Sequence, residues 1–338
     1  MLSILGLFTL SAGYNVRGKI SLAERIDLRS QLHGLAEMGV QKVVVEFEKE
    51  KTSSGFNALN YSWANAEELF HSVPVGGGSF SVSYVFRDPG EDQERVQYGV
   101  QDEESRINLN TAEAKVLSRF FQLVAGLEED EAGILAYSIT DWRDSDTFMS
   151  HPEYGAEDDY YEELDMPYES KDQPFDVVDE VLLVRGMNPE IFEKVKDKIT
   201  IYGGGSVNIN TASREVLLAV GLGETVVDKI FRYRPGKDGE ILTPDDRTFS
   251  QPSAITAELT SVIPLSPSEV AEISNLVSSG ALATVSNYFL ISSRGELEHK
   301  QVAMEVAARI DGEGKIFSWS AGLPKRIVIS SDSEVLPS

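Results

Sequence analysis

The chain has 338 residues, with 55 acidic side chains against 30 basic ones, four histidines and no cysteine. The formal net charge of −25 argues against a nucleic-acid partner, because proteins bind a polyanion by neutralising its phosphates with Lys and Arg. The absence of cysteine excludes disulfides, thiolate metal sites and cysteine nucleophiles, and the scattered histidines disfavour a histidine zinc site. The acidic surplus favours divalent cations instead.

The first 50 residues predict one long helix. Residues 1–12 are apolar but fall short of the about 20 apolar residues needed to cross a bilayer. They fit either the end of a longer membrane segment, over residues 1–13, or the start of a soluble helix. From residue 14 to 51 apolar side chains recur at helical spacing: Ile20, Ala23, Ile26, Leu32, Leu35, Met38, Val43 and Phe47. An ordinary core-packing helix and a filament or membrane spine both remain open.

Two-residue alternation of apolar side chains predicts strands near both ends of the chain. It occurs at 80–86 and 96–100, with a turn at 88–90, and again at 302–310 and 316–319. The economical arrangement is an α+β fold, in which one antiparallel sheet built from both ends packs on the N-terminal helix. The expected divisions are a helix at 1–50, a split β domain at 51–107 and 284–322, an insertion at 108–283 and a flexible tail at 323–338.

An internal repeat divides the predicted insertion. Residues 106–112 (RINLNTA) recur as residues 206–212 (SVNINTA), roughly 100 residues later. We interpret each copy as the opening of a helix, because Asn is a favoured N-cap and Asn110 has capping-box spacing to Glu113. A glycine break and a second helix follow in each copy. The insertion is therefore expected to consist of two helical-hairpin subdomains, 108–205 and 206–283.

Helix, glycine hairpin and helix is also the pattern of helix-hairpin-helix DNA-binding modules, in which hairpin amides hold a phosphate. Residues 220–223 (VGLG) fit that shape. Residues 128–131 (EEDE) place four carboxylates at the equivalent position of the first copy, where they repel a phosphate. A nucleic-acid-binding module is kept as the alternative function.

An acidic loop lies inside the first copy. It begins with Asp141, Asp144 and Asp146 and continues through an acidic stretch from 153 to 165. Calcium binds six to eight oxygen ligands, and the spacing of Asp144 and Asp146 lets alternate side chains converge on one ion. A solvated acidic run and a paired-carboxylate glycosidase are the competing interpretations. P-loop, serine-elbow and zincin motifs are missing, so no enzyme is predicted.

Several motifs occur in a characteristic order along most of the chain. They are residues 102–112 (DEESRINLNTA), 141–146 (DWRDSD), 155–161 (GAEDDYY), 179–187 (DEVLLVRGM) and 207–212 (VNINTA). Together they resemble the general secretion pathway protein K family, the minor pseudopilins of bacterial type II secretion. The resemblance implies a pilin-like helix and sheet interrupted by an all-α insertion of two SAM-like subdomains. It also implies a place at the pseudopilus tip with other minor pseudopilins, a role in starting assembly, and no catalysis.

The resemblance further implies calcium in the insertion. The ligands carried over are carboxylates of the acidic loop: Asp144, Asp146, Glu157, Asp158, Asp141 and Asp159. The implied location is the bacterial inner membrane, single-pass, with the bulk in the periplasm and contact with the inner-membrane secretion machinery. The family's prepilin leader and full hydrophobic segment are missing from this sequence. An anchor through the N-terminal helix is therefore expected if the full-length start lies upstream of Met1.

Overall fold

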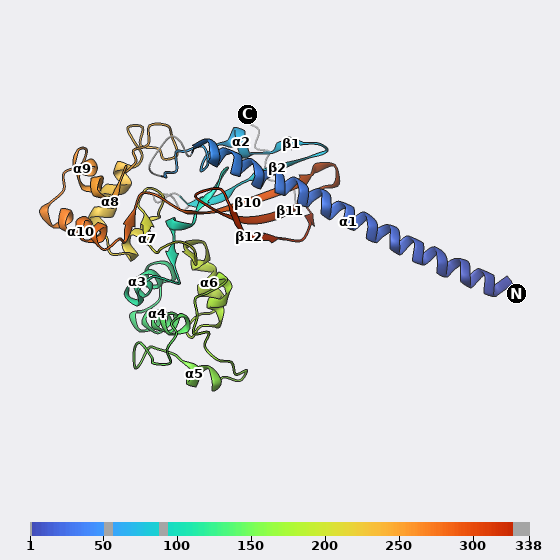
Figure 1. The fold of residues 1–338 in the computed structure, drawn as a ribbon, viewed down its shortest axis with the longest axis horizontal. Coiled ribbons are helices and arrows are strands. Elements are labelled where there is room, and N and C mark those ends of the chain that lie inside the picture. The colour runs from blue at the N-terminus through green and yellow to red at the C-terminus, as the bar shows by residue number, and fades with distance from the viewer. Residues whose placement is uncertain (1, 51–56, 88–93, 327–338) are drawn as a thin grey trace, which may run out of the picture.

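The computed structural model describes residues 2–50, 57–87 and 94–326, and the side chains of its first helix from residue 19 to 49. A long helix, α1 (Leu2–Glu50), lies along one face of an antiparallel sheet. Two groups of short helices extend from the sheet on the side away from the protruding N-terminus (Figure 1). The result is a rod with a wide, two-lobed head.

Helix α1 is one uninterrupted helix of 49 residues, as predicted. Its second half packs on the sheet through a stripe of buried side chains at three- and four-residue spacing: Leu32, Leu35, Ala36, Val40, Val43 and Phe47. The prediction that Met38 shares this face is wrong, since Met38 is 46% exposed. It lies two residues from Ala36 and from Val40, about 200° around the helix axis.

The N-terminal half of α1 projects beyond the sheet (Figure 1). Ile20 and Ile26, predicted on the packing face, are 54% and 61% exposed because no sheet lies beside them. The side chains of residues 1–13, interpreted as the end of a membrane segment, lie outside the described residues. Within the described part of the chain, no helix combines the length and apolarity that crossing a bilayer requires.

The main sheet joins both ends of the chain, which confirms the central prediction about the fold. Its order is β1-β2-β10-β11-β12, all antiparallel, with β5 paired to β10 and β13 paired to β11. The strands are β1 (Val73–Val75), β2 (Gly78–Val82), β5 (Gln101–Asp102), β10 (Tyr288–Leu297), β11 (Val302–Asp311), β12 (Ile316–Ala321) and β13 (Lys325–Arg326). A four-residue helix, α2 (Glu67–Phe70), precedes β1.

Three strand predictions need correction. The run at 80–86 forms two strands, because the chain leaves the main sheet after Val82 and β3 (Tyr84–Arg87) pairs with β4 (Glu94–Gln97) in a separate two-stranded sheet. The second predicted strand, at 96–100, ends at Gln97. The expected tail at 323–338 begins inside the sheet, since β13 pairs with β11, whereas residues 327–338 lie outside the described part. The predicted turn at 88–90 also lies outside it.

Strand β10 is the centre of the sheet, and the alternation pattern missed it. Its buried positions begin with Phe289 and Ile291 but continue with Ser293 and Gly295. Small residues are needed there because α1 approaches closely: Ser293 donates a hydrogen bond to the carbonyl of Ala36 (2.7 Å). A Cβ on Gly295 would meet the carbonyl oxygen of Leu32 and, at 2.7 Å, the nitrogen of Ala36. Close packing thus removes the apolar signal by which strands are recognised.

We expect Gly295→Ala to lower the free energy of unfolding by about 1–3 kcal/mol, the usual cost of overpacking a tight contact. Gly34→Ala in α1 is the control, because its Cβ would have no atom within 4 Å. That change should be neutral or stabilising, since Ala favours helix over Gly. Urea denaturation measures both. Equal stability of the two variants would contradict the close approach of α1 to β10.

The insertion consists of two similar copies with one shared core. The first contains β6 (Ile107–Asn108), α3 (Ala114–Ala125), α4 (Glu129–Arg143), α5 (Asp158–Glu162), α6 (Pro189–Val195) and β7 (Ile199–Thr200). The second contains β8 (Val207–Asn208), α7 (Arg214–Ala219), α8 (Glu224–Tyr233), α9 (Ile255–Thr260), α10 (Pro267–Ser278) and β9 (Leu282–Ala283). Short 3-10 helices occur at Glu103–Ser105, Val178–Leu183, Lys196–Lys198, Pro252–Ala254 and Glu298–Lys300.

Each copy is closed by a short parallel strand pair. Strand β6 pairs with β7, and β8 pairs with β9, so each copy begins and ends at the same place. The shared core runs from Ile107 to Leu282 and is separate from the core under α1. Because each copy returns to its starting point, the chain enters and leaves the insertion beside the main sheet.

Candidate functional site

The repeated sequence forms a turn that holds each copy together, and it does not cap a helix as predicted. Helix α3 begins at Ala114 with Glu113 as its N-cap residue. The amide side chain of Asn110 instead pairs with the backbone of Phe175, accepting from its N–H (2.7 Å) and donating to its carbonyl (3.1 Å). Asn108 accepts from the N–H of Asn110 (2.8 Å) and so shapes the turn.

The second copy repeats this geometry. Asn210 pairs in the same way with the backbone N–H and carbonyl of Phe249 (2.8 and 3.0 Å). In each copy an arginine near the end of the second helix donates to two carbonyls of the turn. Arg143 donates to Leu109 and Ala112, and Arg234 donates to Ile209 and Ala212. Burial lowers the pKa of Arg234 to about 9. Sequence reasoning missed the role of both arginines, because Arg143 lies 31 residues after Ala112 and Arg234 lies 22 residues after Ala212, so their spacing from the repeat differs.

A buried carboxylate joins the insertion to the sheet. Asp102, on β5, is 3% exposed and accepts hydrogen bonds from the hydroxyls of Ser286 (2.6 Å) and Thr211 (2.5 Å). It also accepts from the side-chain amide of Asn208 (3.2 Å) and the N–H of Glu104 (2.8 Å). Burial raises the pKa of Asp102. Glu104 precedes the first copy, Asn208 and Thr211 lie at the start of the second copy, and Ser286 follows it. The side chain of Asp102 therefore fixes the positions of both copies relative to the sheet.

The adjacent Glu103 extends this joint. Its carboxylate accepts from Arg106 (3.1 Å), from the hydroxyl of Thr200 (2.7 Å) and from Arg309 on β11 (2.9 Å). The first copy is thereby attached to the sheet by an ion pair as well as by the chain.

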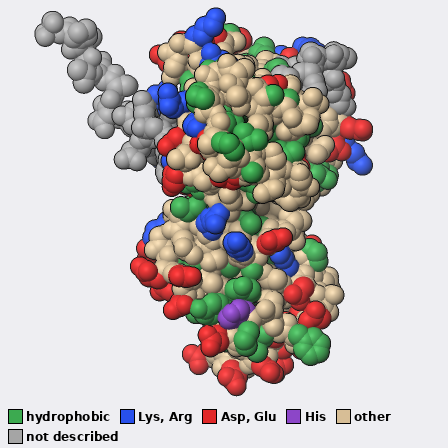
Figure 2. Space-filling model, turned by 90° about the vertical axis from the view of Figure 1, so that its left-hand side faces the viewer, with side chains coloured by type: hydrophobic (Ala, Val, Ile, Leu, Met, Phe, Trp, Pro, Cys, Tyr) green, Lys and Arg blue, Asp and Glu red, His purple; other side chains and the backbone are tan. Residues whose placement is uncertain are grey.

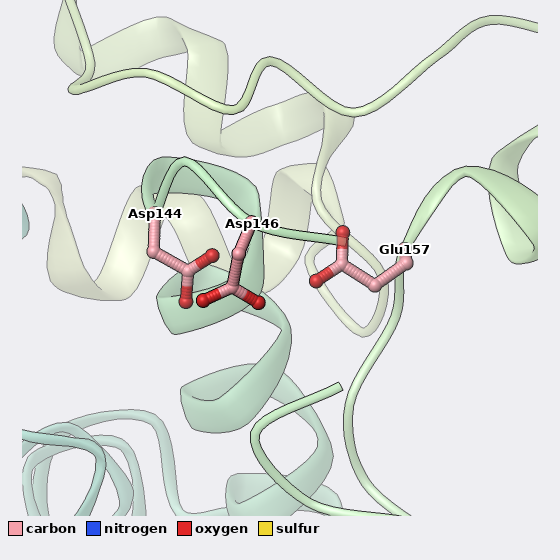
Figure 3. Close-up of side chains that lie close together, drawn as sticks. All are labelled: Asp144, Asp146 and Glu157. Atoms are coloured by element: carbon pink, nitrogen blue, oxygen red, sulfur yellow. The ribbon is translucent and has the colours of Figure 1, made fainter. Parts of the chain in front are cut away.

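Three of the predicted ligands lie together at the far end of the first copy. Asp144 directly follows α4, Asp146 lies two residues further on, and Glu157 directly precedes α5. One carboxylate oxygen from each residue lies within 4.8 Å of those from the other two, and the side chains point toward a common centre (Figure 3). Asp146 is exposed, Asp144 is half-buried and Glu157 is 7% exposed. Figure 2 shows acidic side chains gathered over this end of the molecule.

The cluster lacks the hydrogen-bond donors that buried carboxylates normally have. Within the described part of the chain, neither oxygen of Glu157 nor Oδ1 of Asp144 has a hydrogen-bond partner, although these atoms are buried. Burial and the nearby charges of Asp141, Asp144, Asp172 and Asp146 raise the pKa of Glu157 to about 8. Burial likewise raises the pKa of Asp144. Unpartnered carboxylates that raise one another's pKa are the arrangement a hard cation stabilises.

The other three predicted ligands lie outside this cluster. Asp141 is buried and both its oxygens are occupied, by Ser150 and by the N–H of Ala156 (2.7 Å). Asp158 accepts from the N–H and hydroxyl of Ser170 (2.7 and 2.8 Å). These two residues therefore shape the loop. Asp159 is exposed.

Asp172 is a further neighbour of the cluster, and it was not among the predicted ligands. Its charge contributes to the raised pKa of Glu157, and it accepts from the hydroxyl of Ser170 (2.7 Å). Its φ of +51° is a left-handed conformation that Asp tolerates better than most residues. Distance along the chain gave no signal for it, because 15 residues separate it from Glu157.

The glycine hairpins are not arranged to bind a phosphate. In the second copy, the N–H of Gly223 donates to the carboxylate of Glu272 on α10 (2.5 Å). The nearby Lys229 is paired with Glu269 (2.7 Å). A carboxylate of the same chain thus already occupies the hairpin amide, and four acidic residues follow the first hairpin at 128–131. The nucleic-acid alternative is not favoured.

The geometry defines a class of fold: a long helix on an antiparallel sheet, interrupted by a duplicated helical insertion. Residues 98–204 match the family model described as "Type II secretion system (T2SS), protein K". This match, and the two relatives described below, confirm the resemblance predicted from the motifs.

Relatives and a solved structure agree with this assignment. Type II secretion system protein K of Aeromonas hydrophila is 29% identical over 226 residues, which cover 60% of this chain and 62% of that protein. Protein K of Pectobacterium carotovorum subsp. carotovorum is 27% identical over 161 residues, 46% of this chain and 48% of that protein. The matches thus span less than two thirds of either relative.

The fold also matches a chain in the crystal structure of the GspK-GspI-GspJ complex from the type 2 secretion system of enterotoxigenic Escherichia coli. The TM-score is 0.62 at 16% identity, over 91% of this chain and 99% of that one. The two chains share a fold.

Proposed function

We propose that the protein is a minor pseudopilin of the bacterial type II secretion system, which forms the pseudopilus tip and helps to start its assembly. The observation that carries this proposal is the protruding helix α1 beside a head much wider than the helix (Figure 1). The comparisons support the proposal through the match of residues 98–204 to the protein K family model. The role is mechanical, and no catalysis is needed for it.

The shape accounts for a capping role. The projecting half of α1 leaves exposed apolar side chains, such as Ile20, Leu22 and Ile26, on which other helices can pack. The insertion extends from the sheet on the side away from the protruding half of α1 (Figure 1). A subunit can therefore join along the protruding helix, whereas one placed beyond the head would collide with the insertion.

The proposed partners are other minor pseudopilins, of the GspI and GspJ type, together with the inner-membrane secretion machinery. The solved complex that shares the fold contains GspI and GspJ beside GspK, which supports this choice. The proposed location is the periplasm, with a single-pass inner-membrane anchor through the N-terminal helix.

The second part of the proposal is that Asp144, Asp146 and Glu157 hold a structural calcium ion. Carboxylate oxygens are the ligands that calcium prefers, and backbone carbonyls and water complete its six to eight positions. When bound, the ion would neutralise carboxylates that otherwise repel one another. These three residues come from both ends of a 14-residue connection, Asp144 to Glu157, so binding would fix the loop between α4 and α5.

A deletion tests the capping role. Strand β5 pairs with β10 through Asp102 and Phe289, so the two ends of a chain lacking residues 104–286 lie beside each other and accept a short glycine linker. In cells we expect this variant still to assemble through α1, because the apolar face of α1 is unchanged. It should no longer limit filament length or support secretion. Electron microscopy of pseudopili and a secretion assay measure both.

The control is the full chain expressed at the same level. Pseudopili of normal number and length, with normal secretion, in cells carrying the deletion variant would contradict the capping role. Failure of the full chain to restore secretion in a strain that lacks it would contradict the proposed function as a whole.

A further inference from the structure

One edge of the main sheet is open. Strand β12 is the last strand in the order and pairs on one side with β11. On its other side, none of the described residues pairs with it. Its residues read Ile-Phe-Ser-Trp-Ser-Ala and are half-buried or exposed throughout. An edge strand presents unpaired backbone N–H and C=O groups, which are able to bind another extended chain.

Apart from one irregularity in its register with β11, this edge lacks the features by which proteins usually protect such strands. Prolines, charges and very short strands are the common protections. The opposite edge has two of them, because β1 is three residues long and contains Pro74. Strand β12 has six residues and neither a proline nor a charge. It exposes aromatic side chains instead: Phe317 is 41% exposed and Trp319 is 36% exposed.

The two aromatic side chains lie on opposite faces of the sheet. The register between β11 and β12 shifts at Phe317, which stands beside Tyr202 and Tyr288 with ring centroids 5.4 and 5.5 Å apart. Trp319 is paired with Ala308 and lies beside His33 of α1 at 5.7 Å. A strand added to β12 would therefore meet an aromatic side chain on each of its faces.

The charges along the edge differ from those of the rest of the chain. Lys315 precedes β12 and follows the acidic residues Asp311 and Glu313 of the turn, Lys325 and Arg326 follow β12 in β13, and no acidic residue lies between residues 315 and 326. This occurs in a chain with 55 acidic residues. A partner strand flanked by Asp or Glu would be attracted here and would find little attraction over most of the remaining surface.

The direction of the free amides follows from one hydrogen bond. The N–H of Gly322 donates to the carbonyl of Glu305 on β11 (2.8 Å). Amides alternate in direction along a strand, so the N–H groups of Ala321 and Trp319 point away from β11. These are the donors that an added strand would use.

We propose that β12 binds an extended, acidic edge strand of a neighbouring pseudopilin, which continues the sheet across the two proteins. The inference rests on the proposed function and identifies one surface by which that assembly is made. Main-chain hydrogen bonds would give affinity, and the aromatic side chains and the basic flanks would give specificity.

The test uses the full chain and the purified GspI- and GspJ-type pseudopilins of the same secretion system, with the dissociation constant measured by sedimentation. Ala321→Pro removes one outward N–H, and proline is tolerated at an edge strand. We expect it to weaken the complex at least about tenfold, through one lost hydrogen bond and the clash of the ring with the added strand. Ala321→Val is the matched control, because it keeps the N–H, and its affinity should stay within about twofold, as for a surface substitution.

Hydrogen exchange gives a second readout in the same complex. The amides of Trp319 and Ala321 should become protected on binding, and thermal melts of the two variants should agree. If Ala321→Pro binds as tightly as Ala321→Val, or if these amides stay unprotected, the edge inference is wrong while the proposed function stands. If the unaltered chain binds neither pseudopilin, the proposed function fails and the inference fails with it.

Two further outcomes would assign the edge to a different occupant. Self-association of the unaltered chain that Ala321→Pro abolishes would indicate a second copy. Tighter binding after removal of residues 327–338 would indicate the chain's own terminus. Either outcome would overturn the occupant proposed here.

Discussion

Calcium should raise the melting temperature of this protein, and the increase should be larger at about pH 8 than at about pH 5. A ligand that binds only the folded state stabilises it by mass action, by about 2.7 kcal/mol at a concentration 100 times its dissociation constant. The pH dependence follows from Glu157, whose pKa is raised from 4.5 to about 8 by burial and neighbouring carboxylates. Below that pH a proton on Glu157 competes with the metal.

In the metal-free protein, stability changes with pH in the opposite direction. Between pH 4.5 and about 8 the folded state keeps a proton on Glu157 that the unfolded chain has released. The stability from this group is therefore fully present below 4.5 and is lost as the pH rises through about 8. In the presence of a chelator, the melting temperature should fall across this window.

Variants separate the metal site from general charge effects. Glu157→Gln keeps the side-chain shape and removes the charge, so it should abolish the calcium response and flatten the fall above pH 4.5. Asp144→Asn with Asp146→Asn should also abolish the response. Asp159→Asn is the matched control, because Asp159 is an exposed acid of the same region outside the cluster. A melt of the unaltered chain that calcium and chelator leave unchanged would refute the calcium site.

The second large effect is expected at the joint between the sheet and the insertion. Asp102→Ala should lower the free energy of unfolding by about 3–5 kcal/mol, because it leaves buried donors without an acceptor. These donors are Ser286, Thr211, Asn208 and the N–H of Glu104. Since the sheet and the insertion have separate cores, the variant should also unfold in two steps.

Urea denaturation measures the free energy of unfolding, and hydrogen exchange at increasing urea concentration shows whether the sheet and the insertion unfold in separate steps. Asp102→Asn is the milder control, since an amide of the same shape still accepts hydrogen bonds and carries no buried charge. A single transition for Asp102→Ala, with stability within about 1 kcal/mol of the unaltered chain, would show that the joint does not depend on this residue.

The fold was predictable where the pattern is local or repeated. The length of α1 follows from the absence of proline, and the insertion follows from the recurring NxNTA sequence. Strand β10 was not predictable in this way. Its inward-facing residues Ser293 and Gly295 lie against the backbone of α1, which leaves no room for larger apolar side chains. The role of Asn110 was also mistaken, since its partner, Phe175, lies 65 residues away. Helix-capping rules describe only neighbours in sequence.

The candidate site was predictable in part for a related reason. The two-residue spacing of Asp144 and Asp146 is a local signal, and Glu157 came from the family resemblance. Nothing in the sequence distinguishes Glu157, whose oxygens have no described donors, from Asp141, whose oxygens accept three hydrogen bonds. Whether an acid binds a cation or a backbone amide is decided by packing, which composition does not report.

The placement of β10 has a consequence for how the protein reaches its folded state. Strand β2 ends at Val82, and its partner β10 begins only at Tyr288. A chain that emerges with its N-terminus first must hold β2 and the inner face of α1 unpaired until nearly all of it has been delivered. The insertion closes its own contacts earlier, so it is expected to fold first, as domains generally do during synthesis. The apolar face of α1 would need shelter during that interval, for example by a chaperone, and the order in which the parts fold would then differ from the order in which they are delivered.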